Sequence, residues 1–483
     1  MQTHKILSPL EGSSSGQNTP LHIFTMGSIL LCVVSFVLTT ILLLFYPYGV
    51  NYGEAPLLDQ ALHITAGTNI YKPDLRFPPY VIANYTPIYP LLTGGLHRLT
   101  SLPLFQVGRA VSIFAAIASS LLLGSFARKL FNTRMAGFLA AGLFLGHPYV
   151  GLWSGLVRVD SLALAFSLAG LWIACFRWRS SYWLAIALLC LLASVFTRQT
   201  YLLAAPLACA VWLLHNDWKR GATFLAIFAI LGLAIFLVLN TVTQGGFYQH
   251  IVIANINRYP IGRILSMGTL LLIIGPMLFI MAGITIRKAV MRPLDPVLIW
   301  GLLPYTGGAL LTALTVGKVG SDINYFLELI AVSAIWAAGM WMTKRSRLVA
   351  SLLTIHTVWT VAFSGLLFQV PLVKLWNNIP RTDALARQVR AAAVKGPVLA
   401  DDRLDLVVLA GQAIYYQPFE YTQMYTAGVW DITSFKEEIA SQKFHLILIH
   451  PAYRQDRWPA PIYDTIQQNY TCILQTGMLV CQP

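Results

Sequence analysis

The first candidate for chemistry is a carboxylate, Glu54, within the segment Asn51-Tyr-Gly-Glu-Ala-Pro-Leu-Leu-Asp-Gln-Ala-Leu-His. A glutamate can act as a general base that takes a proton from an acceptor hydroxyl group. The apolar spacing predicts a helix that ends near Gly67, and a carboxylate at its start would also be stabilised by the helix dipole. Asp59 and His63 lie one turn apart, as a solvated pair or half of a metal site. No third ligand follows at suitable spacing, so we expect no metal.

An aromatic, proline-rich turn follows, with the sequence Asn84-Tyr-Thr-Pro-Ile-Tyr-Pro. Asn84, Tyr85 and Tyr89 are candidates for contact with a substrate. Tyrosines in a membrane protein also serve as interfacial anchors, and this alternative stays open for both of them. The turn is expected to lead into a second helix over residues 91–99.

Basic and acidic side chains also occur together in three shorter turns. These candidates are Arg158, Asp160, Arg198, Lys318, Asp322, Asn324 and Glu328. The first two form either an ion pair that holds a helix start or part of a site. Glu328 lies one turn from Asn324 in apolar sequence and needs a partner, for which Arg158 and Arg198 are the candidates. The surplus of bases favours a phosphate ligand, because guanidinium binds phosphate in a fixed fork and ammonium binds it as a point charge.

The elements that carry these residues belong to a very apolar chain. Of its 483 residues 57% are hydrophobic and 11% are charged, which excludes an ordinary soluble enzyme. The net charge of +14 lies entirely before residue 371, where bases occur in pairs and triplets between long apolar stretches. This pattern favours membrane topology over nucleic-acid binding.

Eleven apolar stretches are expected to span a bilayer, since a span needs about 20 residues and fewer where protein shields it. They are 22–46, 104–126, 135–153, 157–176, 181–196, 199–214, 221–240, 266–286, 296–316, 325–343 and 348–370. With a cytoplasmic N-terminus every inner loop is basic, through Lys5, Arg128, Lys129, Arg134, Arg177, Arg179, Lys219, Arg220, Arg287, Lys288, Arg292, Lys344, Arg345 and Arg347. The sequence therefore predicts an integral plasma (inner) membrane protein with its N-terminus inside and its C-terminus outside.

The same topology divides the chain into three parts. Residues 1–21 are rich in Ser and Gly and are expected to be disordered in the cytoplasm. Residues 22–370 form the membrane domain, with a long first outer loop over 47–103. Residues 371–483 form an extracytoplasmic α/β domain, with strands at 397–400 and 446–449 and a helix at 434–441.

The last residues predict a disulfide. Two strands around a turn at Thr476 and Gly477 would place Cys472 opposite Cys481, at a pair where side chains come closest. An oxidising outer compartment would permit the bond. The alternative is two unpaired thiols.

Taken together, these motifs resemble the GT-C superfamily of integral membrane glycosyltransferases. The resemblance rests on the acid soon after the first span, the long outer loop, the Asn-Tyr-x-Pro-x-Tyr turn, the Arg-x-Asp turn and the Asn-Tyr-Phe-x-Glu segment, and it covers residues 52–341. It is closest to the branch that contains protein O-mannosyltransferases and ArnT-like and RgtA/B/C/D-like proteins. It implies transfer of a sugar, with inversion, from a polyprenyl-phosphate carrier to a lipid, glycan or protein acceptor on the outer side of the membrane.

The resemblance also implies residue roles. Glu54 matches the family's catalytic acid, but many relatives have an Asp-Glu pair where this sequence has Gly53-Glu54. Asp160 is our substitute for the second acid. Arg158, Arg198 and Lys318 are expected to hold the donor phosphate, and Arg258 and Arg263 to contribute to a gate over the donor. We expect no cofactor, since no Gly-rich phosphate loop after a strand and no Asp-x-Asp motif is found in the sequence.

Two other functions remain as alternatives. A transporter or flippase of lipid-linked sugars would be expected to have repeated, broken spans with polar residues at mid-membrane, whereas this chain gathers its charge at one face. A scaffold subunit would leave the one-sided cluster of acids and bases without a role.

Overall fold

A computed structural model of the chain describes residues 19–255, 257–291, 295–342 and 346–483. Of the predicted disordered segment, residues 1–18 lie outside the described residues, and residues 19–21 belong to the first helix. The predicted inner-loop bases Lys5, Arg292, Lys344 and Arg345 also lie outside the described residues.

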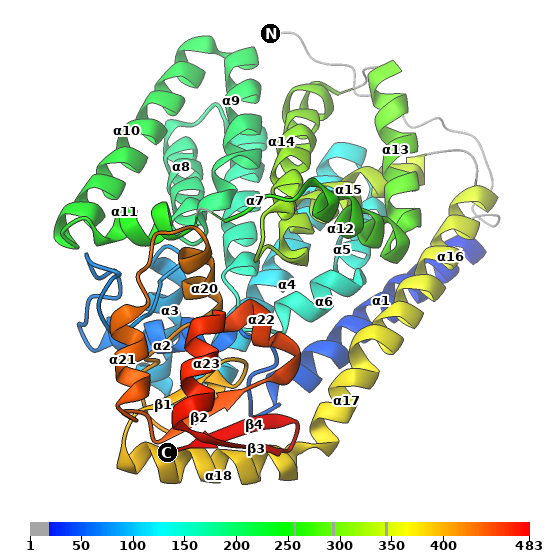
Figure 1. The fold of residues 1–483 in the computed structure, drawn as a ribbon. Coiled ribbons are helices and arrows are strands. Elements are labelled where there is room, and N and C mark those ends of the chain that lie inside the picture. The colour runs from blue at the N-terminus through cyan, green and yellow to red at the C-terminus, as the bar shows by residue number, and fades with distance from the viewer. Residues whose placement is uncertain (1–18, 256, 292–294, 343–345) are drawn as a thin grey trace, which may run out of the picture.

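Helices dominate the fold (Figure 1). Those up to residue 251 are α1 (Thr19–Leu44), α2 (Glu54–Thr65), α3 (Ile88–Thr100), α4 (Leu104–Phe131), α5 (Arg134–Leu145), α6 (Pro148–Ser154), α7 (Asp160–Arg177), α8 (Ser181–Val195), α9 (Ala204–Asn216), α10 (Trp218–Val242) and α11 (Gly246–Ile251). They are followed by α12 (Ile261–Ile274), α13 (Pro276–Met291), α14 (Leu303–Leu314), α15 (Leu327–Ala338), α16 (Ser346–Ser364), α17 (Val370–Asn377) and α18 (Ile379–Lys395). The last part contains β1 (Val398–Ala400), α19 (Leu404–Leu409), α20 (Pro418–Thr426), α21 (Thr433–Ala440), β2 (Leu446–Ile449), α22 (Arg454–Arg457), α23 (Ala460–Asn469), β3 (Thr471–Gln475) and β4 (Met478–Gln482).

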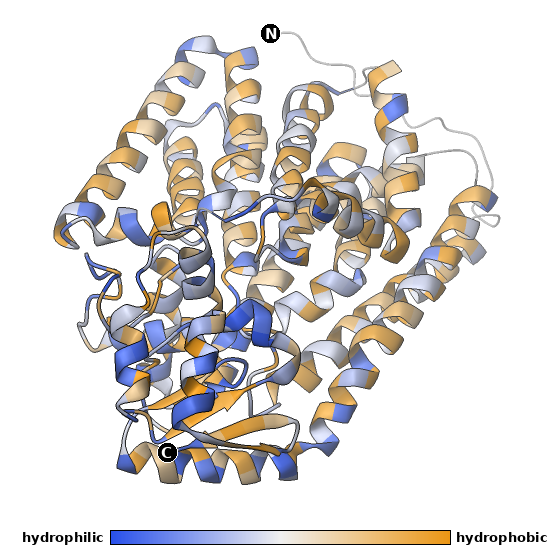
Figure 2. Cartoon of the chain, viewed as in Figure 1, coloured by the Kyte–Doolittle hydropathy of each residue, from blue (hydrophilic) through white to orange (hydrophobic). Residues whose placement is uncertain are grey.

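All eleven predicted spans coincide with helices. Among the described residues, seven helices are long and apolar enough to cross a membrane, or up to nine if each of two bent pairs counts as one span. The predicted spans that fall short of this test are α8, with 15 residues, and α9, with 13. In Figure 2 the hydrophobic colour runs along α10 and α16, while the part around α20–α23 carries most of the hydrophilic colour. The apolar helices make this an integral membrane protein.

Proline explains both bent pairs. The α5–α6 pair bends by 65° and the α12–α13 pair by 90°. Pro148 and Pro276 are the first residues of α6 and α13, where a proline removes a backbone donor and ends the preceding helix. His147 caps α6, because its Nδ1 accepts a hydrogen bond from the backbone N–H of Tyr149 at 3.3 Å.

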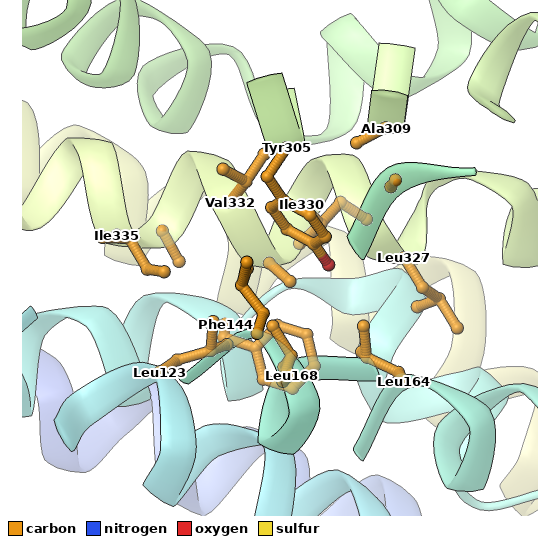
Figure 3. Packing of buried hydrophobic residues seen from close by; sticks show 14 of the residues in the cluster. Leu123, Phe144, Leu164, Leu168, Tyr305, Ala309, Leu327, Ile330, Val332 and Ile335 are labelled. Carbon is orange, nitrogen blue, oxygen red and sulfur yellow. The ribbon is translucent and has the colours of Figure 1, made fainter. Parts of the chain in front are cut away.

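The helix bundle packs around one large apolar core. Figure 3 shows Leu123 of α4, Phe144 of α5 and Leu168 of α7 meeting side chains of α14 and α15. The helices α4 and α5 approach most closely at Gly124 and Gly137, where a Cβ built on either glycine would lie within about 3 Å of the other's carbonyl oxygen. Small residues at such a crossing let two backbones pack tightly inside a membrane, where burial from water contributes little.

A four-stranded sheet lies in the C-terminal part, in the order β1-β2-β4-β3. Its first pair is parallel, and the other two pairs are antiparallel. The strands β1 and β2 and the helix α21 match the predicted elements within one residue at each end. Thr476 and Gly477 have φ angles of 50° and 84°, which suits a two-residue hairpin turn. Cys472 and Cys481 occupy the paired positions expected from this turn and form a disulfide, with Cα atoms 4.0 Å apart.

Residues 47–103, which the sequence predicts as the first outer loop and which keep that name below, are joined to the C-terminal part. Tyr80 donates its backbone N–H to the carbonyl oxygen of Tyr415 at 2.6 Å and accepts from the N–H of Gln417 at 2.8 Å. The Tyr80 ring is fully buried against those of Tyr416, Trp430 and other aromatic residues. Residues more than 300 positions apart in sequence are thereby held at a common surface, just before α20 begins.

Candidate functional site

A cavity of about 920 Å³ lies between the first outer loop, the ends of several helices and the C-terminal part. Residues of α2, α12, α20 and α22 line it, and these elements can be located in Figure 1. Its described lining includes five basic side chains, Arg158, Arg198, Arg263, Lys318 and Arg457, and three carboxylates, Asp322, Glu420 and Asp456. The surplus of positive charge is suited to an anionic ligand.

Glu54 lies outside this lining and is fully buried. Its Oε1 accepts from Arg109 Nε at 2.9 Å and from the backbone N–H of Val157 at 3.0 Å. Its Oε2 accepts from the backbone N–H of Val50 at 2.7 Å and from that of Asn51 at 3.2 Å. Burial alone would raise the pKa of Glu54, but the Arg109 guanidinium and the backbone donors hold it below its usual value. A carboxylate with these partners has no free edge for a substrate proton, which argues against the general-base role expected for Glu54.

Asp160 is also fully buried and does not line the cavity. It forms an ion pair with Arg198 and accepts from Trp153 Nε1 at 2.7 Å and from Asn324 Nδ2 at 3.0 Å. Both oxygens are therefore occupied, which argues against Asp160 as the second catalytic acid. Its contacts instead hold the Arg198 guanidinium at the cavity wall, over the ring of Tyr325 at 4.5 Å.

Arg158 takes the space that a side chain at position 53 would need. A Cβ built on Gly53 would overlap Nη1 of Arg158. The guanidinium lies over the Trp153 ring at 4.6 Å, and its Nη2 donates to Tyr85 Oη at 3.3 Å. The Asp160 carboxylate is 3.9 Å from its Nε, so the expected ion pair is present at the outer limit of contact. Glycine at 53 thus permits a cation to stand at this edge of the cavity.

Lys318, in the turn after α14, and Arg263, in α12, both line the cavity. Lys318 Nζ donates to Asn255 Oδ1 at 3.4 Å, and burial together with the nearby Arg198 lowers its pKa below the usual value. Arg263 donates to the backbone carbonyls of Ser321 and Val316, which fixes the turn before α15. Its guanidinium therefore supports the wall of the cavity.

Arg258, expected to contribute to a gate over the donor, does not border the cavity. It is exposed. Its carbonyl oxygen accepts the N–H of Val319 at 2.9 Å, and Asn257 Nδ2 donates to the Val319 carbonyl at 2.9 Å. These two hydrogen bonds connect the segment to the backbone of the 317–322 turn.

The Asn84–Tyr89 turn contributes unequally. Asn84 and Tyr85 line the cavity, and Asn84 Nδ2 donates to Glu420 Oε1 at 3.2 Å. Tyr89 is fully buried outside it and donates from Oη to the Gly108 carbonyl at 2.8 Å. Tyr89 therefore holds α3 against α4 and does not contact a ligand in the cavity.

Of the three predicted polar residues before and within α15, only Asp322 lines the cavity. Its Oδ1 accepts its neighbour's N–H, that of Ile323, at 2.7 Å. Asn324 and Glu328 are buried in the bundle, as their spacing predicts. Glu328 accepts from Ser167 Oγ at 3.4 Å, and among the described residues it makes no direct ion pair with either expected partner, Arg158 or Arg198.

The lining residues that the sequence analysis missed include Tyr52, Glu420 and Arg457. Tyr52 Oη donates to Glu420 Oε2 at 2.7 Å, and the Arg457 guanidinium lies 3.9 Å from the centre of the Tyr52 ring. The tail that carries Glu420 and Arg457 has balanced charge and no local motif around either residue. Only the packing of this tail on the first outer loop brings them to the cavity.

Comparisons with known proteins bear on the fold. No family model and no curated protein sequence matches the chain. The crystal structure of ArnT from Cupriavidus metallidurans bound to undecaprenyl phosphate is similar, with a TM-score of 0.63 and 11% identity over 96% of this chain and 98% of that chain. Archaeal oligosaccharyltransferase AglB from Archaeoglobus fulgidus, in complex with an inhibitory peptide and a dolichol-phosphate, has a TM-score of 0.54 and 12% identity over 97% of this chain and 74% of that chain.

Both neighbours are GT-C glycosyltransferases, and the likeness to ArnT extends over nearly the full length of each chain. The protein described here is thus an α-helical polytopic membrane protein with the GT-C fold and a small C-terminal α/β part, as its motifs predicted.

Proposed function

We propose that the protein is a membrane glycosyltransferase that moves a sugar, with inversion, from a polyprenyl-phosphate-linked donor to an acceptor hydroxyl. The observation that carries this proposal is the cavity, which combines a cationic wall with carboxylates in a fold shared with ArnT. The acceptor is a lipid, glycan or protein of the cell envelope. Membrane lipids surround the helices. Nucleic acid is not among the proposed partners.

The cationic wall supports a phosphate ligand. Arg158, Arg198 and Lys318 lie in three turns, before α7, after α8 and after α14. All three turns are on the same side of the helix bundle and border the cavity. The described basic residues Arg128, Lys129, Arg177, Lys219, Arg220, Arg287, Lys288 and Arg347 lie at or near the opposite ends. By the positive-inside rule, these opposite ends face the cytoplasm, so the cavity and residues 371–483 face outward.

The two structural neighbours support the class of donor. One structure has undecaprenyl phosphate bound, and the other is a complex with an inhibitory peptide and a dolichol-phosphate. A phosphate held between guanidinium and ammonium groups is a good leaving group, because its developing charge meets fixed cations in a site with little water. The apolar side chains of Leu203 and Ile251, which also line the cavity, offer a path toward the helices for the lipid chain.

Binding and turnover test the proposal separately. Purified protein in nanodiscs is titrated with undecaprenyl phosphate in a thermal-shift assay, with Lys318→Met as the test variant and Arg76→Gln as its control. Arg76 is exposed, forms an ion pair with Asp74 and is not part of the cavity lining. We expect stabilisation of the wild type and of the control, and an affinity at least about tenfold weaker for Lys318→Met.

Turnover is measured with undecaprenyl-phosphate esters of glucose, galactose, mannose and arabinose, and with an envelope extract as acceptor. Release of undecaprenyl phosphate with transfer of the labelled sugar supports the proposal. If the labelled donor crosses a proteoliposome membrane intact, the protein is a transporter. If undecaprenyl phosphate neither binds nor is released, the proposed donor class is wrong.

A further inference from the structure

The reaction proposed above needs a base, and the two carboxylates expected for it are occupied. Glu54 is paired with Arg109, and Asp160 with Arg198, both away from the cavity lining. Position 53 carries no side chain, and Arg158 fills its space. The base therefore has to come from another element of the fold.

Three carboxylates line the cavity, and they differ in their surroundings. Asp456 is exposed, so water stabilises its charge and weakens it as a base. Asp322 accepts the N–H of Ile323 and so helps to start the helical turn before α15. Glu420 is only partly exposed, and it stands in the first turn of α20, on the C-terminal side of the cavity.

Glu420 is held in a fixed orientation. Tyr52 Oη donates to Oε2 at 2.7 Å, and Asn84 Nδ2 donates to Oε1 at 3.2 Å. The start of α20 is itself fixed, because Gln417 donates its backbone N–H to the Tyr80 carbonyl and its side-chain oxygen accepts from the N–H of Ile82 at 2.9 Å. Each Glu420 oxygen can accept a further hydrogen bond, since a carboxylate has about four acceptor positions.

The Asn84–Tyr85 turn connects Glu420 with the cationic wall. Tyr85, the neighbour of Asn84, accepts from Arg158 Nη2 at 3.3 Å. The Asn84 carbonyl accepts from Asn255 Nδ2 at 3.5 Å, and Asn255 Oδ1 accepts from Lys318 Nζ at 3.4 Å. Arg158, Lys318 and Glu420 line one cavity, so a donor whose phosphate lies against the two cations would have its sugar in the space that Glu420 also borders.

We propose that Glu420 is the catalytic base of this transferase, supplied by the C-terminal part of the chain in place of the missing acid at Gly53. The inference rests on the proposed function. The acceptor oxygen attacks the anomeric carbon, and its proton passes to the Glu420 carboxylate. The new carbon–oxygen bond replaces the bond to phosphate, whose electron pair leaves with the polyprenyl phosphate held by the cations.

The protonation equilibrium of Glu420 agrees with this role. Burial raises the pKa of Glu420 above its usual value, against the opposing effects of Tyr52, Arg457 and Asn84. A base with a raised pKa takes a proton more readily than an ordinary carboxylate. The other titratable groups near it are Tyr416 and Tyr421, whose own pKa values are raised by burial.

The test compares Glu420→Gln with Glu437→Gln, which makes the same change at an exposed glutamate of α21 outside the cavity lining. The full-length protein in nanodiscs is assayed with the undecaprenyl-phosphate sugar that the wild type turns over. We expect kcat to fall about 100-fold or more for Glu420→Gln, with the donor KM and the thermal shift by undecaprenyl phosphate unchanged. Glu437→Gln should remain within about threefold of the wild type, a difference well below that expected for loss of a base.

A second variant separates loss of a base from loss of shape. Azide attacks without losing a proton, so sodium azide should restore sugar release by Glu420→Ala as a glycosyl azide, at least about tenfold above the rate without azide. Glu420→Asp keeps the acceptor oxygens if Glu420→Gln fails to fold, and it should lose kcat and not binding.

The possible results are distinct. If the wild type is active and Glu420→Gln keeps more than a third of its kcat, or azide leaves Glu420→Ala unchanged, the base assignment is overturned while the proposed function stands. If the wild type turns over no polyprenyl-phosphate sugar, the proposed function fails and the inference fails with it.

Discussion

Glu54 and Arg109 form a buried ion pair, with 2.9 Å between Oε1 and Nε and no exposed surface on either side chain. Arg109 Nη1 also donates to the carbonyls of Leu43 at 2.7 Å and Tyr46 at 2.5 Å, so the pair fastens the end of α1 to α2 and α4. The pair therefore fixes the position at which residues 47–103 leave α1.

The first prediction concerns this pair. Glu54→Gln should destabilise the protein by about 3–5 kcal/mol, because Arg109 would remain buried without its counter-charge. The measurement is thermal unfolding in detergent, alongside yield, with Asp74→Asn as a surface control. A Glu54→Gln protein that unfolds like the wild type but lacks turnover would restore Glu54 as a catalytic residue.

A second prediction uses Gly53. Gly53→Ala should displace the Arg158 guanidinium and weaken binding of undecaprenyl phosphate about tenfold, which is the effect of losing one charge-assisted contact. Folding should be little affected, since the displaced atom is the end of a flexible side chain and Gly53 has an ordinary φ of −74°. Gly95→Ala is the matched control, because a Cβ there meets nothing within 4 Å. Equal affinities in the two variants would remove Arg158 from the phosphate site.

The third prediction is a pH profile. Because burial raises the pKa of Glu420, kcat/KM should rise with pH through this pKa and fall on the acid side sooner than for an ordinary glutamate. Tyr52→Phe removes a hydrogen bond that lowers the pKa of Glu420, so it should move this acid limb to higher pH. An acid limb that does not move in Tyr52→Phe would assign it to another group.

A fourth prediction concerns the disulfide between Cys472 and Cys481, which closes a loop with a sequence separation of 9. Replacing both cysteines with serine should lower the free energy of unfolding of the C-terminal part by about 2–3 kcal/mol, mostly by freeing the unfolded chain. Denaturant unfolding with and without reductant measures it. If reductant changes neither the wild-type transition nor the mobility of alkylated protein, the thiols are unpaired.

The accuracy of the sequence-based predictions follows how local each feature is. The spans, the β3–β4 hairpin and its cysteine pairing depend on residues close in sequence. The helix ends also predict that Arg158, Arg198 and Lys318 share one face, and all three line the cavity. The partner of Glu54 is 55 residues away and depends on how α4 crosses α2, which no spacing in the sequence reveals.

The role of the tail was harder still to foresee. Glu420 is 336 residues from Asn84, and its neighbours carry no pattern typical of a site. Tyr80 and Tyr416 form a backbone bridge and belong to one buried aromatic cluster, and this contact determines where α20 begins. Such a contact is set by the packed fold, so the residue proposed as the base could be recognised only from the structure.

The pairing of Tyr80 with Tyr416 also has a consequence for biosynthesis. Glu420 and Arg457 complete the cavity lining and are synthesised after the helices next to Arg158, Arg198 and Lys318. Under the functions proposed above, a nascent chain that has inserted its helices already carries the proposed phosphate-binding residues but lacks the proposed base. Activity would then begin only after the tail has folded onto residues 47–103, which would protect the carrier lipid from premature consumption.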